Sequence, residues 1–169
     1  MSYLQVFNEV SAAPHPQHIV PHPTCWLHPP AGAIKINFDG ATFNPTHEKG
    51  ISVVARDSFG NCIPWISHRL SRPASPLIAE ALAAREAISL ALSLGLNRVI
   101  MEGDYITLLH LLRSTGDDNF VFGPLVNEIP KLCSHINCVF SFVRRSGNTV
   151  AHELAKHSGV RVVGSSLLP

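Results

Sequence analysis

The stretch Ala33-Ile34-Lys35-Ile36-Asn37-Phe38-Asp39-Gly40-Ala41 decides how the rest of the chain is interpreted. Apolar and polar residues alternate in it, which is the period of a β-strand with one apolar face. Asp39 therefore projects from the polar face near the end of the predicted strand. Two interpretations of Asp39 stay open: it forms a hairpin turn with the glycine that follows, or it is a functional carboxylate.

The chain has the size and composition of one globular domain. Its 169 residues are 46% hydrophobic, which is sufficient for a core. The net charge of +1 excludes a strongly basic nucleic-acid-binding domain, so any contact with nucleic acid has to be local. No apolar run reaches the roughly 18 residues of a membrane span, and no signal segment opens the chain, so we expect no membrane association.

The cysteines indicate a reducing environment. Cys25, Cys62, Cys133 and Cys138 form no C-x-x-C pair and are scattered over different predicted elements. This pattern argues against a disulfide framework, so we expect reduced thiols in an intracellular protein, in either nucleus or cytoplasm. We also expect the protein to be monomeric.

The predicted elements divide the chain into three parts. Residues 1–29 are rich in proline and histidine and lack periodicity, which predicts a flexible linker. Residues 160–169 are expected to be a tail. Between them the patterns predict strands at 34–39, 51–56, 62–70, 98–102 and 138–143, and helices at 76–94, 105–112, 122–136 and 149–157. This order is typical of an α/β domain with a mixed sheet.

Three acids occupy positions from which they can converge. Asp39 and Asp104 each lie at the end of a predicted strand, and Glu80 borders the apolar stripe of the helix over 76–94. Glu80 could be a structural residue, and Asp104 could be an N-cap of the helix that follows it. Clustered carboxylates repel one another unless cations neutralise them. The alternative is therefore a metal site.

Six motifs follow one another with the spacing of a single domain. They are Trp26-Leu27-His28-Pro29-Pro30, Lys35-Ile36-Asn37-Phe38-Asp39-Gly40-Ala41, Arg56-Asp57-Ser58-Phe59-Gly60, Ala79-Glu80-Ala81-Leu82-Ala83-Ala84-Arg85-Glu86-Ala87, Glu102-Gly103-Asp104 and Arg145-Ser146-Gly147-Asn148-Thr149-Val150-Ala151-His152-Glu153-Leu154-Ala155. In this order they resemble the ribonuclease H-like fold, particularly the ribonuclease H-type domain abundant in plants and at the ends of plant retroelement reverse transcriptases. The resemblance implies a mixed five-stranded sheet, with three antiparallel strands followed by parallel ones, flanked by helices.

The resemblance also implies an activity. Asp39, Glu80 and Asp104 would be catalytic residues and ligands of two Mg²⁺ or Mn²⁺ ions, and the substrate would be the RNA strand of an RNA–DNA hybrid. His152 stands where other members of the family carry a fourth aspartate. It could shuttle a proton to the leaving oxygen, or it could be a partly exposed helix residue.

Candidate contacts with nucleic acid lie near His152. Arg144 and Arg145 could bind phosphate or form a solvated loop, and Arg72 is a further candidate. Asn148 is expected to cap the helix over 149–157, shares a face with His152, and is included among the nucleic-acid contacts. Few basic residues remain for binding, so a non-catalytic nucleic-acid-binding or interaction module, a retroelement remnant, is the alternative function. A purely structural domain is the third.

Overall fold

The computed structural model describes residues 23–42, 49–70, 75–113, 123–159 and 161–165. Within them, six strands form one sheet with the order β5-β4-β1-β2-β3-β6. The strands are β1 (Ile34–Thr42), β2 (Lys49–Arg56), β3 (Cys62–Arg69), β4 (Arg98–Gly103), β5 (Asn137–Phe142) and β6 (Val162–Ser165). The helices are α2 (Pro76–Ser93), α3 (Ile106–Arg113), α4 (Gly123–Cys133), α5 (Thr149–Lys156) and the 3-10 turn η2 (Arg145–Gly147).

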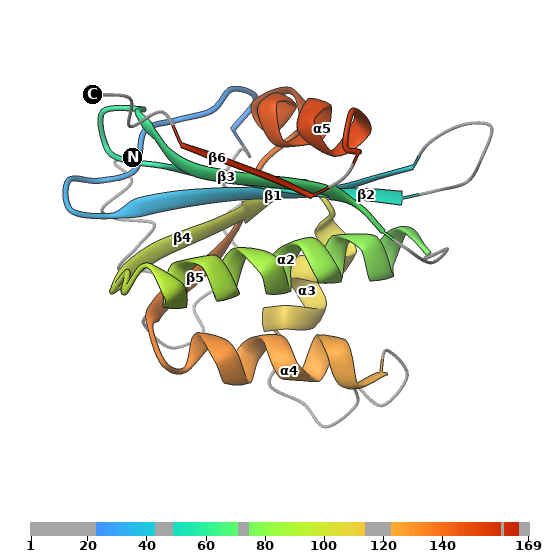
Figure 1. Ribbon diagram of the computed structural model, residues 1–169. Helices are drawn as coiled ribbons and strands as arrows, with labels where there is room; N and C mark the ends of the chain where they lie inside the picture. The colour runs from blue at the N-terminus through green and yellow to red at the C-terminus, as the bar shows by residue number, and fades with distance from the viewer. Residues whose placement is uncertain (1–22, 43–48, 71–74, 114–122, 160, 166–169) are drawn as a thin grey trace.

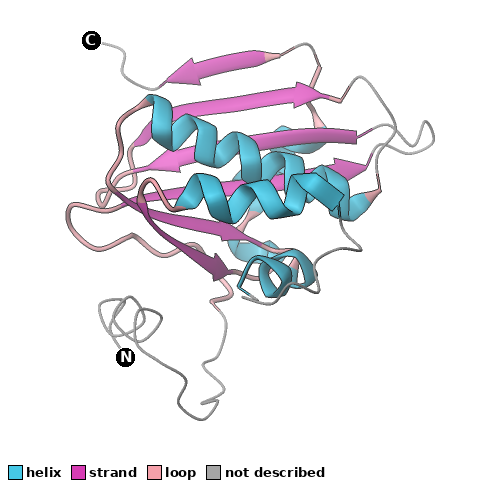
Figure 2. Ribbon diagram, turned by 90° about the horizontal axis from the view of Figure 1, so that it is seen from below, coloured by secondary structure: helices cyan, strands magenta, loops and turns pink. Residues whose placement is uncertain are grey.

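The sheet is mixed and β1 lies near its centre. β1, β2 and β3 form an antiparallel meander, whereas β4 and β5 run parallel to β1. α2, α3 and α4 cover one face and α5 covers the other (Figure 1; Figure 2 views the sheet from the side of α2). The predicted fold class is therefore confirmed. No helix in the described part of the chain is long and apolar enough to cross a membrane.

The interpretation of Asp39 as a turn residue is wrong, because β1 continues past it. Asp39 pairs with Ser52 inside the antiparallel ladder, and Gly40 follows on the face covered by α2. A Cβ atom on Gly40 would lie 2.7 Å from the carbonyl carbon of Ala79 and 2.8 Å from the amide nitrogen of Glu80. Glycine is needed here since α2 approaches the strand closely, and this approach brings Glu80 to Asp39.

The sheet has one strand more than predicted, and the extra strand lies in the expected tail. β6 pairs antiparallel with β3, from Val162 opposite Ser67 to Ser165 opposite Pro64. Only four residues long, β6 leaves its valines 48% and 59% exposed, so it has no apolar periodicity for a sequence to display. The unpaired edge of β3 provides the partner for this strand.

The predicted linker is also too long at its C-terminal end. Residues 1–22 lie outside the described part of the chain, but residues 23–29 pack against the sheet. The indole Nε1 of Trp26 donates to Oδ1 of Asn37 (2.9 Å), and Nζ of Lys35 donates to the carbonyl of Leu27 (2.8 Å). From residues 23–29 these contacts use one aromatic side chain and one main-chain carbonyl, and such contacts produce no hydrophobic period in the sequence.

Candidate metal centre

Three elements bring the predicted acids together. Asp39 lies in β1 two residues past Asn37, the last residue that pairs with the parallel strand β4, and Asp104 directly follows β4, so both lie where these two strands stop pairing. Glu80 lies in the first turns of α2, beside Gly40. One carboxylate oxygen from each of the three acids lies within 4.8 Å of the other two. Residues distant in sequence thus form one compact cluster.

The cluster is buried and incompletely hydrogen-bonded. The side chains of Asp39 and Asp104 are 0% and 2% exposed, and Glu80 is 2% exposed. Each acid has one buried oxygen without a hydrogen-bond partner among the described residues: Oδ1 of Asp39, Oε2 of Glu80 and Oδ1 of Asp104. Buried carboxylate oxygens without a partner are costly. These oxygens are also the ligand atoms that Mg²⁺ and Mn²⁺ prefer, so the residues fit a divalent ion.

Burial and mutual repulsion change the protonation of the cluster. Burial, with the nearby negative charge of Asp104, raises the pKa of Asp39 to about 6. Burial raises the pKa of Glu80 well above its ordinary value, and the charges of Asp39 and Asp104 add to this rise. Both shifts favour the neutral acid, whereas a bound cation favours the carboxylate.

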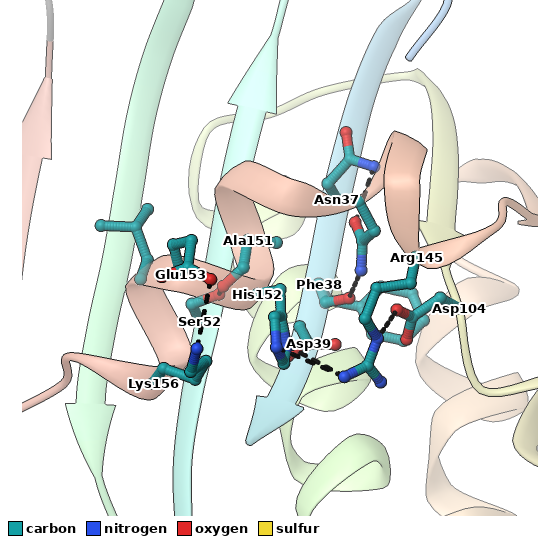
Figure 3. Close-up of polar contacts among 12 residues, drawn as sticks. Asn37, Phe38, Asp39, Ser52, Asp104, Arg145, Ala151, His152, Glu153 and Lys156 are labelled. Atoms are coloured by element: carbon teal, nitrogen blue, oxygen red, sulfur yellow. Dashed lines mark hydrogen bonds and ion pairs between the residues drawn. The ribbon is translucent and has the colours of Figure 1, made fainter. Parts of the chain in front are cut away.

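His152 contacts the cluster from the other face of the sheet. Its Nδ1 lies 2.9 Å from Oδ2 of Asp39, and its side chain is 18% exposed (Figure 3). An ionised carboxylate only accepts hydrogen bonds, so Nδ1 donates to Asp39 and Nε2 is left to accept or exchange a proton. The histidine is therefore part of the site as well as partly exposed.

Arg145 lies against the acids and not in a solvated loop. Its Nε is 2.8 Å from Oδ2 of Asp104, and its Nη1 is 3.3 Å from both ring nitrogens of His152 (Figure 3). The side chain is still 57% exposed. Burial alone would lower the pKa of Arg145, but the charges of Asp104 and Asp39 raise it. The guanidinium thus supplies positive charge to the cluster.

The other candidate nucleic-acid contacts have different locations. Arg144 is exposed and precedes Arg145 in the sequence, and Arg72 lies outside the described residues. Asn148 is 0% exposed, and its side chain makes no cap hydrogen bond to α5. Its Nδ2 donates instead to the carbonyl of Phe38, and its Oδ1 accepts from Asn37, both at 3.0 Å. Asn148 is the N-cap residue of α5, as predicted, but its side chain connects α5 with β1 and makes no cap hydrogen bond.

A family model described as reverse transcriptase-like matches residues 37–158, which include the three acids, Arg145 and His152. The chain belongs to the reverse transcriptase-like family. Its resemblance to ribonuclease H is thereby confirmed, whereas the assignment to the plant branch stays a prediction. None of the curated proteins compared with this reverse transcriptase-like chain matches it significantly.

Solved structures similar to this reverse transcriptase-like chain include ribonucleases H. RNase H1 from the halophilic archaeon Halobacterium salinarum NRC-1 is 20% identical, with a TM-score of 0.63 over 73% of this chain and 94% of that protein. LC11-RNase H1, isolated from compost by a metagenomic approach, is 22% identical, with a TM-score of 0.62 over 73% and 93%. The N-terminal RNase H domain of Rv2228c from Mycobacterium tuberculosis is 19% identical, with a TM-score of 0.61 over 73% and 90%. At these identities the likeness shows the fold.

The structure of this reverse transcriptase-like chain contains a layer of buried polar residues behind the acids that was not predicted from the sequence. Lys35, Asn37 and Glu102 are all 0% exposed. Nζ of Lys35 lies 2.9 Å from Oε1 of Glu102, and Nδ2 of Asn37 lies 3.0 Å from its Oε2. Asn37 and Glu102 each stand two residues before one of the acids, Asp39 and Asp104. Residues two apart on a strand share a face, so this spacing could have indicated the polar layer.

Proposed function

We propose that this protein is a divalent-metal-dependent ribonuclease that cleaves the RNA strand of RNA–DNA hybrids. The observation that carries the proposal is the buried cluster of Asp39, Glu80 and Asp104, with ligand oxygens within 4.8 Å of one another and, on each acid, one oxygen that has no partner among the described residues. The structurally similar LC11-RNase H1 has been solved in complex with an RNA/DNA hybrid (21% identity, TM-score 0.62), which supports the choice of substrate.

Asp39, Glu80 and Asp104 would hold two Mg²⁺ or Mn²⁺ ions. When bound, such ions supply an activated water and stabilise the charge that develops on the leaving 3′ oxygen. Two features of the three acids support metal binding. The acids provide hard oxygen ligands, and each of them has one buried oxygen without a hydrogen-bond partner among the described residues.

The residues around the acids have separate tasks in this proposal. His152 donates through Nδ1 to Asp39, which leaves Nε2 to pass a proton to the leaving oxygen. Arg145 neutralises Asp104 while no other cation does so, and its half-exposed guanidinium can turn to a phosphate. Arg144 is exposed next to it and can contact a second phosphate. Hybrid recognition would depend on these few cations and on groove shape.

Cleavage of a fluorescently labelled RNA–DNA hybrid tests the proposal. We expect cleavage with Mg²⁺ or Mn²⁺, none with EDTA, and none by Asp39→Asn, which keeps the side-chain shape and removes the charge. Asp57→Asn is the matched control, because Asp57 is a half-buried turn residue that accepts hydrogen bonds from Phe59 and Asn61 and is not part of the acidic cluster. Cleavage by Asp39→Asn at the rate of the control would contradict the proposal.

Two observations favour the alternative, a non-catalytic module that binds nucleic acid or another partner. Arg145 already pairs with Oδ2 of Asp104 and so neutralises part of the negative charge without metal, and His152 already makes a hydrogen bond with Oδ2 of Asp39. This module would bind the hybrid equally well in EDTA and in Mg²⁺ and would leave the RNA intact. Equal binding by the wild-type chain and Asp39→Asn, without cleavage by either, would select this alternative.

A further inference from the structure

Asn37 is the centre of a buried hydrogen-bond network next to the acidic cluster. Its Nδ2 donates to Oε2 of Glu102 and to Oδ1 of Asn148, both at 3.0 Å. Its Oδ1 accepts from Nε1 of Trp26 (2.9 Å) and from Nη2 of Arg56 (3.0 Å). An amide side chain has two donor hydrogens and an acceptor with two lone pairs, so every bond that Asn37 can make is made.

The network reaches the start of α5. Nδ2 of Asn148 donates to the carbonyl of Phe38, and the carbonyl of Asn148 accepts from the amide of His152 in the first turn of the helix, both at 3.0 Å. Arg145 lies three residues before Asn148. The hydrogen bond from Asn148 to β1 fixes the start of α5 against the strand. It therefore also sets where Arg145 and His152 lie relative to the acids, because these side chains move with the first turn of the helix.

A buried ion pair between Lys35 and Glu102 contacts the amide nitrogen of Asn37. Lys35 and Glu102 form an ion pair of 2.9 Å with both side chains 0% exposed, and Lys35 also donates to the carbonyl of Leu27. A buried ion pair is a weak source of stability but has strict geometric requirements. Glu102 thus fixes the direction in which the Asn37 amide points, toward Asn148 on the far side.

Residues 23–29 complete the network from outside the sheet. Trp26 stacks against Arg56, whose guanidinium carbon is 4.1 Å from the ring centroid, and the two side chains converge on Oδ1 of Asn37. The same segment contacts the loop before α5, where the amide of Arg144 donates to the carbonyl of Pro23 (3.1 Å). Residues 23–29 therefore contact the hydrogen-bond network at Asn37 on β1 and also contact the loop before α5.

We propose that Asn37 is a positioning residue for the candidate metal centre, and that Trp26 completes it. Asn37 holds Asn148, and through it Arg145 and His152, in place relative to Asp39 and Asp104. The inference concerns the regulation of geometry at the same site and so rests on the function proposed above. Its main readout uses the metal-free protein and does not depend on cleavage.

Nuclear magnetic resonance of the metal-free protein tests the proposal. The ¹⁵Nε–H signal of Arg145 reports its ion pair with Asp104, and the ring ¹⁵N signals of His152 report its contact with Asp39. In Asn37→Ser we expect the Arg145 signal to move toward that of an exposed arginine and its exchange with water to accelerate up to about fivefold, the factor that corresponds to losing about 1 kcal/mol of this solvent-screened pair. The His152 ring signals should shift with it.

Ser67→Ala is the matched control. Ser67 Oγ donates to the carbonyl of Leu154 (2.8 Å), so this variant also removes a bond from the sheet to α5, but one turn beyond the site. The control should leave both signals in place. Unchanged Arg145 and His152 signals in a folded Asn37→Ser, or equal shifts in Ser67→Ala, would overturn the proposal.

Two further measurements keep the outcome decisive. If Asn37→Ser does not fold, Trp26→Phe takes its place, because it keeps a ring against Arg56 and removes the indole donor. We expect the same displacement of the Arg145 signal in this variant. An unchanged Arg145 signal would overturn the proposal. If the wild-type chain cleaves hybrids, the folded variant should also lose kcat, because the side chains that it displaces, Arg145 and His152, contact the acids. A chain that cleaves nothing contradicts the proposed function but leaves the resonance test valid.

Discussion

Nδ1 of His152 lies 2.9 Å from Oδ2 of Asp39, and this contact joins α5 to the end of the central strand. The other oxygen of Asp39 is buried without a partner among the described residues. One half of the carboxylate is therefore held by an imidazole and the other half is left for a ligand. An imidazole carries no negative charge in either protonation state, so the cluster is less negative than it would be with a fourth carboxylate.

His152→Asp should strengthen metal binding. The change adds a fourth acid next to Asp39 and removes a hydrogen-bond donor, so a divalent ion gains attraction that the wild-type site lacks. We expect Mn²⁺ to bind about tenfold more tightly, equivalent to about 1.4 kcal/mol, in calorimetric titration. His157→Asp is the control, because it makes the same charge change on a 75% exposed side chain. Equal affinities of the two variants would contradict this prediction.

Metal-free stability should fall as the pH rises through the acidic range. Asp39 holds its proton in the folded chain up to a pKa of about 6, whereas the unfolded chain releases it near its ordinary value of 3.8. Between these values the folded state binds more protons, so the free energy of unfolding decreases with increasing pH. The displacement corresponds to about 3 kcal/mol at neutral pH. Glu80, whose pKa is also raised, adds a loss of the same sign.

Denaturant unfolding in EDTA between pH 4 and pH 7.5 measures this effect. Histidines contribute their own dependence on pH, so the informative quantity is the difference between the wild-type chain and Asp39→Asn, which cannot ionise at this position. The stability of the wild-type chain should fall relative to that of the variant as pH rises, and saturating Mg²⁺ should remove the fall. Parallel curves for the two proteins would show that the folded chain does not hold a proton on Asp39.

The sequence predicted those parts of the fold that depend on local periods. Alternation in β1 and the alanine stripe of α2 are properties of single elements, and the mixed sheet follows from their order. Asp39, Glu80 and Asp104 could be found because each stands at the end or edge of a clear element. Their convergence depends on the parallel pairing of β1 with β4, which β2, β3 and α2 separate in the sequence, and on the close approach of α2 to β1 at Gly40.

The parts that were not predicted depend on contacts between distant residues. Asn37 is an ordinary polar strand residue until Trp26, Arg56 and Asn148 are placed around it. Asn148 has the residue type and position of a helix cap, but its amide finds stronger partners inside the sheet. β6 has no amphipathic pattern since both of its valines are exposed. A period in the sequence does not encode any of these pairings.

Arg145→Ala should raise metal affinity while lowering metal-free stability. The guanidinium of Arg145 pairs with Asp104 at 2.8 Å and therefore competes with a divalent ion for that carboxylate. Because the arginine side chain is 57% exposed, solvent screens the pair, and we expect up to about 1 kcal/mol, or about fivefold in the dissociation constant. Titration with Mn²⁺ followed by water proton relaxation gives the constant.

Arg144→Ala is the control for this variant, since it removes the same charge from the neighbouring exposed position. It should leave Mn²⁺ affinity close to that of the wild-type chain and weaken only the binding of nucleic acid. If Arg144→Ala and Arg145→Ala change Mn²⁺ affinity equally, the effect comes from net charge and not from the ion pair with Asp104.

Gly40→Ala should separate Glu80 from the other acids. The added Cβ would meet backbone atoms of Ala79 and Glu80 at 2.7 to 2.8 Å, and main-chain atoms cannot rotate away, so α2 has to move. We expect about 1 to 3 kcal/mol of lost stability and a weaker Mn²⁺ complex. Gly159→Ala, whose Cβ would meet nothing within 4 Å, should change stability by less than about 0.5 kcal/mol. Thermal unfolding and Mn²⁺ titration of both variants measure these effects, and wild-type Mn²⁺ affinity in Gly40→Ala would show that Glu80 does not need the close approach of α2.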